Sequence, residues 1–355
     1  FDWRLAGAEP WTPGQDLAYL ISKSEQRKQA YTDSAASATS MTAGVKSYND
    51  AINVDWQGKQ VEPIARPLQR QGYSIGVVTS VPISHATPAA AYANNVTRDD
   101  YQDLTRDLLG LPSVAHPDEP LPGVDVLLGT GWGAESMIDA AQGENFVPGN
   151  KYLAKADREQ VDWQHGGKYE VIERTAGVRG ATALAEAAQA AKQNQRRLFG
   201  FFGVSGPAGS AASHLPFRTA DGGFNPAPGV SSKTDPDVDP RTGAYLEANV
   251  SENPTLADMA TAALDVLATN PKGFWLMIEA GDVDWANHDD NVDNSIGAVC
   301  SGDDAFRAVT QWAEKNGCWD ETVVIVTADH GHLLVLDEPE AIAAAGRGSP
   351  ASGAR

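Results

Sequence analysis

Short apolar runs alternate along this chain with longer segments whose apolar residues recur at helical spacing. The runs predict buried strands at residues 73–80, 124–130, 197–203, 273–281 and 322–329. The amphipathic segments predict helices at residues 34–47, 61–71, 88–94, 100–109, 180–194, 255–269 and 302–315. This alternation predicts an α/β fold, with a large, mostly parallel central sheet and helices on both faces. Functional residues in such sheets gather where the strands end.

Residues 205–250 interrupt the alternation with a long stretch rich in Gly, Pro, Ser and Asp. We expect one domain over residues 1–355, with a loop-rich insertion at about 205–250 near the mouth of the site. The sequence "DPDVDP" in this stretch suggests a calcium loop. However, Pro240 stands where the turn glycine belongs and Leu246 where the bidentate acid belongs, so we expect a solvated acidic turn.

The chain is strongly acidic, with 47 Asp and Glu against 27 Lys and Arg and a net charge of -20. Like charges repel, so we expect no nucleic-acid partner. The longest apolar runs are only as long as a strand, so we expect no membrane span. An acidic surface fits a periplasmic or secreted protein. The sequence shows neither a signal peptide nor an initiator Met, which indicates a processed or incomplete chain.

The two cysteines, Cys300 and Cys318, flank a segment with helical spacing. A helix of about 14 residues is about 21 Å long, whereas a disulfide needs Cα atoms within about 7 Å. We therefore expect no disulfide between them.

Metal-binding residue types follow a predicted strand in "IEAGDVDWANHDDN". The apolar run ends at Glu279, and Asp284 and His288 follow four residues apart. In a helix these two side chains share one face and can chelate one ion, while Glu279 can serve a neighbouring ion. A surface turn or helix cap is the alternative explanation.

A second such segment is "VVIVTADHGH", where an apolar run leads directly to Asp329 and His330, with His332 two residues further on. Two such segments in one α/β chain favour metal binding over two surface turns. Carboxylate and imidazole ligands without thiolates suit zinc at a catalytic site, and magnesium suits any site of oxygen ligands alone.

Small residues fill the segment "TDSAASATSMTAGVKSYN". Ser34 stands where a helix begins, a position that favours an anion. A serine needs a base or a metal to become a nucleophile. The alternative is an ordinary Asp33 or Ser34 cap on an alanine-rich helix.

Three further candidates lie between residues 85 and 98. His85 and Thr87 stand in "PISHATPAAAY", with Thr87 as the cap of a helix that begins at Pro88. Arg98 follows in "NNVTRDD", and a guanidinium can pair with two phosphate oxygens. A solvated surface side chain is the alternative for Arg98.

Together these segments resemble the alkaline phosphatase family over nearly the whole chain. "TDSAASATSMTAGVKSYN" is similar to its nucleophile motif and "HATPAA" to its third-metal segment. "EAGDVDWANH" and "VIVTADHGH" are similar to its two zinc segments, and the four motifs stand in the family's order. The resemblance implies hydrolysis of phosphate monoesters through a phosphoserine, with two zinc ions and one magnesium ion.

The resemblance also implies roles for the candidate residues. Ser34 is the nucleophile, and Arg98 holds the phosphate oxygens. One zinc ion lies on Asp284 and His288, and the other on Asp329, His330 and Ser34. The resemblance places His332 beside the metal ions, where it orients a metal-binding carboxylate. The other residues that it places at or around the magnesium and zinc ions are Glu279, Thr87, His85, Asp33 and Trp285.

The sequence departs from the family pattern in four places. His85 stands where some members have Asp, and Trp285 where some have Lys or His, so we expect a changed third ion and changed phosphate release. The family's early Gly-Asp-Gly turn and its late zinc-binding His are not in this sequence. Each metal site is then one ligand short and a central strand is missing, so we expect the sequence to be part of a longer protein.

Other functions stay open at this point. A phosphodiesterase of the same superfamily is one alternative, and an inactive, metal-poor phosphate-binding or structural relative is another. The segment "SAAS" after Asp33 excludes a sulfatase, which needs x-Pro-x-Arg after its Cys or Ser. Family members often form homodimers, so the resemblance implies one here.

Overall fold

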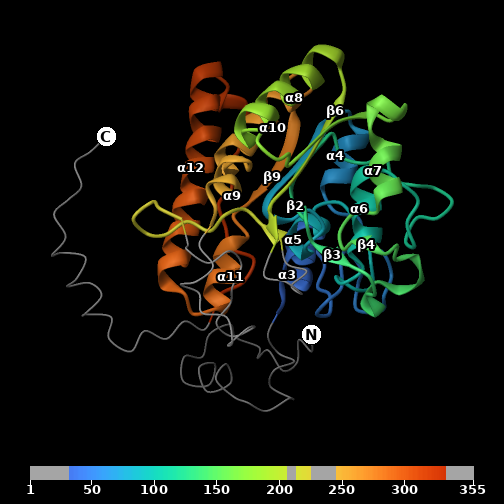
Figure 1. Ribbon diagram of the computed structural model, residues 1–355. Helices are drawn as coiled ribbons and strands as arrows, with labels where there is room; N and C mark the ends of the chain where they lie inside the picture. Colours follow the sequence, from blue (N-terminus) through green and yellow to red (C-terminus); the bar gives the residue numbers. More distant parts are fainter. Residues whose placement is uncertain (1–31, 206–212, 225–244, 333–355) are drawn as a thin grey trace, which may run out of the picture.

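A parallel sheet lies at the centre of the computed structural model, which describes residues 32–205, 213–224 and 245–332 (Figure 1). Its strands follow the order β5-β6-β2-β1-β9, and every neighbouring pair is parallel. Their bounds are Tyr169–Glu173, Arg197–Phe202, Val126–Thr130, Ser74–Pro82 and Phe274–Glu279. The predicted α/β architecture is confirmed.

Helices cover both faces of this sheet (Figure 1). One face carries α8 (Gly180–Asn194), α10 (Leu256–Leu267) and α12 (Val292–Asn316). The opposite face carries α4 (Ala65–Arg70), α6 (Tyr101–Leu109) and α7 (Lys155–Val161). Three further helices, α3 (Ser34–Ala43), α5 (Ala86–Ala90) and α11 (Asp282–His288), lie together at one end of the sheet in Figure 1.

Short elements complete the described chain. They are β3 (Glu135–Ser136), β4 (Gly149–Asn150), β7 (Val204–Ser205), β8 (Ser213–His214) and α9 (Glu247–Ser251), with 3-10 helices at Ala140–Asn145, Trp163–His165 and Trp319–Glu321.

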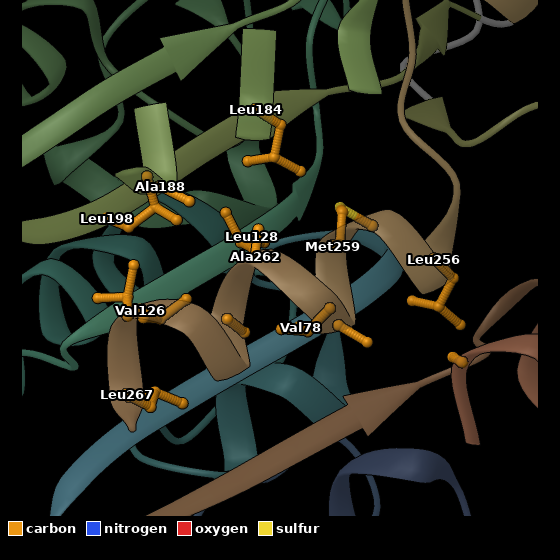
Figure 2. Packing of buried hydrophobic residues seen from close by; sticks show 14 of the residues in the cluster. Val78, Val126, Leu128, Leu184, Ala188, Leu198, Leu256, Met259, Ala262 and Leu267 are labelled. Atoms are coloured by element: carbon orange, nitrogen blue, oxygen red, sulfur yellow. The ribbon is translucent and has the colours of Figure 1, made fainter. Parts of the chain in front are cut away.

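Two hydrophobic clusters anchor the helices to the sheet, because successive strand residues point to opposite faces. Val78 and Leu128 belong to the cluster under α8 and α10, which Figure 2 shows, whereas Val77 and Leu127 belong to the cluster on the other face. All four side chains are fully buried. The continuous apolar runs in the sequence reflect strands that are covered on both sides.

The predicted strand at residues 322–329 is wrong. The chain there is neither strand nor helix, and Val323, Ile325 and Val326 are 85%, 80% and 77% exposed. A strand needs a neighbour for its backbone N–H and C=O groups. Within the described residues, β9 forms the edge of the sheet and pairs only with β1.

Several predicted helices have different bounds. The helix expected at 34–47 ends at Ala43, because Gly44 adopts a left-handed conformation (φ 69°) that terminates the helix. The helix expected at 302–315 is part of the longer α12, and β5 was not predicted. Cys300 and Cys318 are both free thiols, as expected. The "DPDVDP" turn lies outside the described residues.

Candidate active site

Ser34 is the first residue of α3 and is only 7% exposed. The helix begins there because Asp33, in an extended conformation, accepts a hydrogen bond from the backbone N–H of Ala36 at 2.9 Å. The carboxylate of Asp33 also accepts from the backbone N–H of Asp50 at 3.0 Å. Asp33 is therefore the N-cap of α3, one of the two residues that the sequence offered as an ordinary helix cap.

The small residues of α3 allow it to pack closely against α5, which is also alanine-rich. Ala35 and Ala38 of α3 are fully buried against Ala86, Ala89 and other small side chains. Larger side chains would hold the two helix backbones further apart. This packing brings Ser34 and the residues around His85 to the same end of the sheet.

His330 reaches the serine from the far end of the chain. Its Nε2 lies 3.0 Å from Ser34 Oγ, and its Nδ1 lies 3.1 Å from the carbonyl oxygen of Gly331. A carbonyl only accepts, so we assign the proton to Nδ1, and Nε2 presents a lone pair toward the serine. Asp329, next to His330, accepts a hydrogen bond from Ser37 Oγ at 3.3 Å.

Asp284 and His288 lie one turn apart on α11, as the sequence predicted for a helical segment. Asp284 Oδ1 lies 3.4 Å from Nε2 of His288, 3.5 Å from that of His330 and 3.0 Å from that of His332. Burial works against ionisation of Asp284, but its interactions with these imidazoles outweigh burial and lower its pKa. The two motif segments therefore meet at this carboxylate.

Glu279 ends β9 and accepts a hydrogen bond from Thr79 of the neighbouring strand β1. Burial raises the pKa of Glu279 to about 7, and the charges of Asp329 and Asp284 add to this rise. The hydrogen bond with Thr79, and then that with Thr87, oppose it. A nearby cation would stabilise the charged form of all three carboxylates.

Arg98 bridges two other candidate residues. Its Nη1 donates to Asp33 Oδ2 at 3.1 Å, and its Nη2 lies 3.4 Å from His85 Nε2. Burial, followed by the charge of Arg98, lowers the pKa of His85 to about 3. His85 is therefore neutral near pH 7 and can accept from Arg98 or bind a cation through Nε2.

Trp285 lies between two histidines, His85 and His214. Its ring meets His85 edge to face at 5.7 Å between centroids and His214 at 5.8 Å, both with planes at 75°. His214, in β8, is fully buried, and its Nδ1 lies 2.5 Å from the carbonyl oxygen of Leu215. Trp285 therefore has a fixed place beside His85.

Sequence reasoning missed Ser37, Thr79 and His214. Ser37 stands three residues after Ser34 on α3, so the helical spacing could have placed it on the same face. Thr79 faces Glu279 across a strand pair, and His214 follows a segment outside the described residues. No pattern in the sequence pointed to Thr79 or His214.

The donor set fits divalent metal ions. Asp284 Oδ1 is a buried carboxylate oxygen that accepts no hydrogen bond from the described residues, which is rare for such an atom. Ligand atoms of Asp284, His288 and His332 lie within 4.8 Å of one another. A second set of donors, Asp329, His330 and Ser34, adjoins it. Carboxylates and imidazoles are zinc ligands.

A model of the family described as "Alkaline phosphatase" matches residues 17–345. The chain belongs to the alkaline phosphatase family. It is 30% identical over 304 residues to alkaline phosphatase 4 of Bacillus subtilis, a match that covers 84% of this chain and 49% of the relative. It is also 30% identical over 336 residues to alkaline phosphatase of Escherichia coli, covering 92% and 64%. The chain thus spans about half to two thirds of the length of these relatives.

Solved alkaline phosphatases share the fold. The enzyme from Shewanella sp. aligns with a TM-score of 0.52 and 23% identity, covering 81% of this chain and 52% of that chain. A variant of the enzyme from the Antarctic bacterium TAB5, described with Mg bound in the M3 site, aligns with a TM-score of 0.53 and 21% identity, covering 85% and 64%. In the described part of this chain, no helix is long and apolar enough to cross a membrane.

Proposed function

We propose that this chain hydrolyses phosphate monoesters, with Ser34 as the nucleophile. The observation that supports it most is the 3.0 Å contact between Ser34 Oγ and His330 Nε2, at the point where the Asp284 and Asp329 segments meet. The nearly buried Ser34, at the N-terminus of α3, faces the lone pair of His330 Nε2. An N–H group at this position would instead donate a hydrogen bond to the serine oxygen. The arrangement suits attack on an anionic ester.

Three ions complete the proposed site. Asp284 and His288 would hold one zinc ion, and Asp329, His330 and Ser34 Oγ would hold the other. Glu279 and Thr87 would hold magnesium, with His85 beside or within this third site. When bound, these ions lower the pKa of attacking hydroxyl groups and neutralise charge on the phosphoryl oxygens.

The reaction consists of two displacements at phosphorus. Ser34 Oγ attacks, the ester P–O bond breaks, and the alcohol leaves with a proton. Water then attacks the phosphoserine, the bond from phosphorus to Ser34 Oγ breaks, and inorganic phosphate is released. Arg98 has five N–H donors and two fixed contacts, so it can also pair with two phosphate oxygens.

Location and assembly extend the proposal. The acidic surface and the bacterial relatives support a periplasmic or secreted enzyme that acts on small phosphate esters, and a homodimer follows from the family resemblance. We further propose that residues 1–355 form one domain, with the insertion at about 205–250 beside the site.

The decisive experiment compares wild type with Ser34→Ala at saturating Zn²⁺ and Mg²⁺. Wild type should release p-nitrophenol from p-nitrophenyl phosphate, and acid quenching followed by mass spectrometry should locate phosphate on Ser34. Ser34→Ala should lose at least about 1,000-fold in kcat/KM and show no phosphoprotein. Ser40→Ala is the matched control, because among the described residues Ser40 Oγ bonds only to the α3 backbone and Val45.

Two results would overturn the proposal. Faster hydrolysis of bis(p-nitrophenyl) phosphate than of the monoester would identify a phosphodiesterase. Binding of inorganic phosphate without turnover or phosphoserine, in the presence of both metals, would identify an inactive phosphate-binding relative.

A further inference from the structure

Asp100 stands at the N-cap position of α6, where the side chain of an aspartate normally accepts a hydrogen bond from a backbone N–H of the first turn. The Asp100 side chain makes no such bond, although it is only 7% exposed. Its Oδ2 accepts from Asn95 Nδ2 at 2.9 Å, whereas its Oδ1 is buried and no described residue donates a hydrogen bond to it. Buried carboxylate oxygens rarely lack a donor, so this arrangement calls for an explanation.

The Asp100 side chain instead forms a hydrogen bond with the carboxyl group of Asp103, in the first turn of α6. Two ionised carboxylates only accept, so this bond requires a proton on one of the two groups. Asp103 Oδ1 accepts from Arg106 Nη1 and from the backbone N–H of Val114, both at 3.1 Å. Its Oδ2 accepts from Asn145 Nδ2 at 3.1 Å. These three donors stabilise a charged Asp103, so we assign the proton to Oδ1 of Asp100.

The surroundings of Asp100 favour its protonated form. Burial raises the pKa of Asp100 to about 7. The hydrogen bond from Asn95 and the charge of Arg106 oppose this rise, whereas the charge of Asp103 and its hydrogen bond add to it. Asp100 therefore gains or loses its proton near neutral pH, far above the usual range of an aspartate.

Other elements around α6 supply no charge that could replace this proton. The remaining charged side chains near the pair are bound to one another or exposed: Arg106 bonds to Asp157 of α7 at 2.8 Å, His116 pairs with Asp107 at 2.9 Å, and Glu144 is exposed. Helix α5, which packs against α6, has no ionisable side chain. The bond between the two aspartates therefore depends on the proton itself.

Asn95 connects this bond to the loop that carries Arg98. Its Oδ1 accepts from the backbone N–H of Thr97 at 3.1 Å, and Thr97 Oγ1 accepts from the backbone N–H of Asp99 at 3.3 Å. Arg98 lies between these two anchored residues. The loop is therefore fixed to α6 through Asn95 and the Asp100 carboxyl group.

We propose that Asp100 donates a shared proton to Asp103 and thereby positions Arg98, and that loss of this proton at higher pH loosens the loop. The inference rests on the proposed role of Arg98 in phosphate binding and deepens it. Without the proton, two buried carboxylates at hydrogen-bond distance repel each other. Asp100 then moves away from Asp103, and phosphate is held less tightly in alkaline solution. Asp100 is a positioning residue, since it acts on phosphate only through Arg98.

The shared proton can be measured without any turnover. The full chain, loaded with Zn²⁺ and Mg²⁺ and labelled with ¹³C at its aspartate carboxyl groups, is titrated by NMR from pH 4 to pH 9. The Asp100 signal, identified by its absence in Asp100→Asn, should titrate near pH 7 instead of near the ordinary value of 3.8. If Asp100→Asn does not fold, sequential assignment of wild type identifies the same signal.

The effect on Arg98 is measured as the dissociation constant of inorganic phosphate, by calorimetry at pH 6 and pH 9. Asp100→Asn keeps an N–H donor toward Asp103 at every pH, whereas Asp100→Ala removes the connection. At pH 6, wild type should match Asp100→Asn, and Asp100→Ala should bind phosphate about 10-fold more weakly. At pH 9, wild type should bind about 3- to 10-fold more weakly than Asp100→Asn. Comparison at each pH cancels the titration of phosphate and of metal-bound water.

The matched control is Asp162→Asn. Asp162 is also 7% exposed, but it caps the 3-10 helix at Trp163–His165 through the backbone N–H of Gln164. This variant should follow wild type at both pH values. Near-UV circular dichroism checks that each variant is folded.

Two outcomes would overturn the inference. One is an Asp100 signal that titrates near pH 4, as an ordinary aspartate does. The other is a ratio of phosphate dissociation constants, wild type to Asp100→Asn, that is the same at pH 6 and pH 9. Phosphomonoesterase assays are independent of both: turnover together with either outcome refutes the inference alone, and a titrating Asp100 with pH-dependent phosphate binding but no turnover refutes the proposed function alone.

Discussion

Arg98 donates a hydrogen bond at 3.1 Å to Asp33, the residue that caps the helix beginning with Ser34. Both side chains are mostly covered, at 16% and 19% exposure. The candidate phosphate-binding guanidinium is therefore tied to the helix that presents the candidate nucleophile. The same guanidinium meets His85 Nε2 at 3.4 Å, which connects it to the proposed third site.

Replacing Arg98 should weaken phosphate binding more than it weakens the fold. We expect Arg98→Ala to lower kcat/KM about 10- to 100-fold and to raise the inhibition constant of inorganic phosphate by a similar factor, since paired donors to two oxygens are lost. Arg98→Lys should recover only part of this loss, because an ammonium group cannot donate two parallel hydrogen bonds to two phosphate oxygens as a guanidinium does. Steady-state kinetics with phosphate as inhibitor measure both effects.

The control for Arg98 is Arg158→Ala, which removes a different half-buried ion pair, that with Glu173. It should leave phosphate inhibition at the wild-type value. Equal inhibition constants for Arg98→Ala and wild type would show that Arg98 does not contact the phosphate.

Much of the fold could be predicted from apolar periodicity. The runs around Val78 and Leu128 are continuous because both faces of the sheet are covered, and they predicted β1 and β2 within a few residues. The same logic failed at residues 322–329. An apolar run specifies a tendency to extend, whereas a strand also needs a neighbour, and local sequence does not show whether one is present.

The candidate site, like the fold, could be predicted from the sequence only in part. The spacing of Asp284 and His288 predicted that they share a helix face, because that relation is local. The contact between Ser34 and His330 joins positions 296 residues apart, so only the family resemblance brought them together. His332 lay in the motif, but its distance to Asp284 is a tertiary fact that the sequence does not contain.

We expect that a glycine is needed at position 44 only because of the backbone conformation there. Its φ is +69° and nothing lies within 4 Å of where a Cβ would be, so an added methyl group meets no clash. Gly44→Ala should lower the free energy of unfolding by about 1 kcal/mol through left-handed strain. Gly44→Asn should cost less, because Asn tolerates this conformation. Urea denaturation distinguishes the variants, and equal stability of all three proteins would refute the explanation.

Close packing of α3 on α5 should matter for both stability and activity. Ala38 is fully buried in this contact, so Ala38→Leu must push the helices apart. We expect about 1–3 kcal/mol of destabilisation, with a lower kcat because Ser34 moves with its helix. Ala185→Leu, at an exposed position of α8, adds the same atoms without this effect. An unchanged kcat in a destabilised Ala38→Leu protein would show that the packing of α3 on α5 does not affect catalysis.

His214 should make the protein less stable in acid. Burial lowers its pKa from 6.5 to about 4, and the hydrogen bond to the Leu215 carbonyl opposes this only in part. Between these values the unfolded chain binds a proton that the folded chain does not. Stability should therefore be retained above pH 6.5 and fall as the pH approaches 4, by about 2–3 kcal/mol between pH 7 and 4.5 from this residue.

The test of His214 compares wild type with His214→Asn, whose amide can still donate to the Leu215 carbonyl. Urea unfolding is measured at pH 7 and pH 4.5 in EDTA, so that metal loss in acid does not contribute. The variant starts from a lower stability because its smaller side chain leaves space beside Phe217 and Trp285. The titration of His214 is therefore measured by the difference in free energy of unfolding between pH 7 and pH 4.5. This difference should be about 2–3 kcal/mol smaller in His214→Asn than in wild type. An identical pH dependence in both proteins would mean that His214 becomes protonated as readily in the folded chain as in the unfolded one.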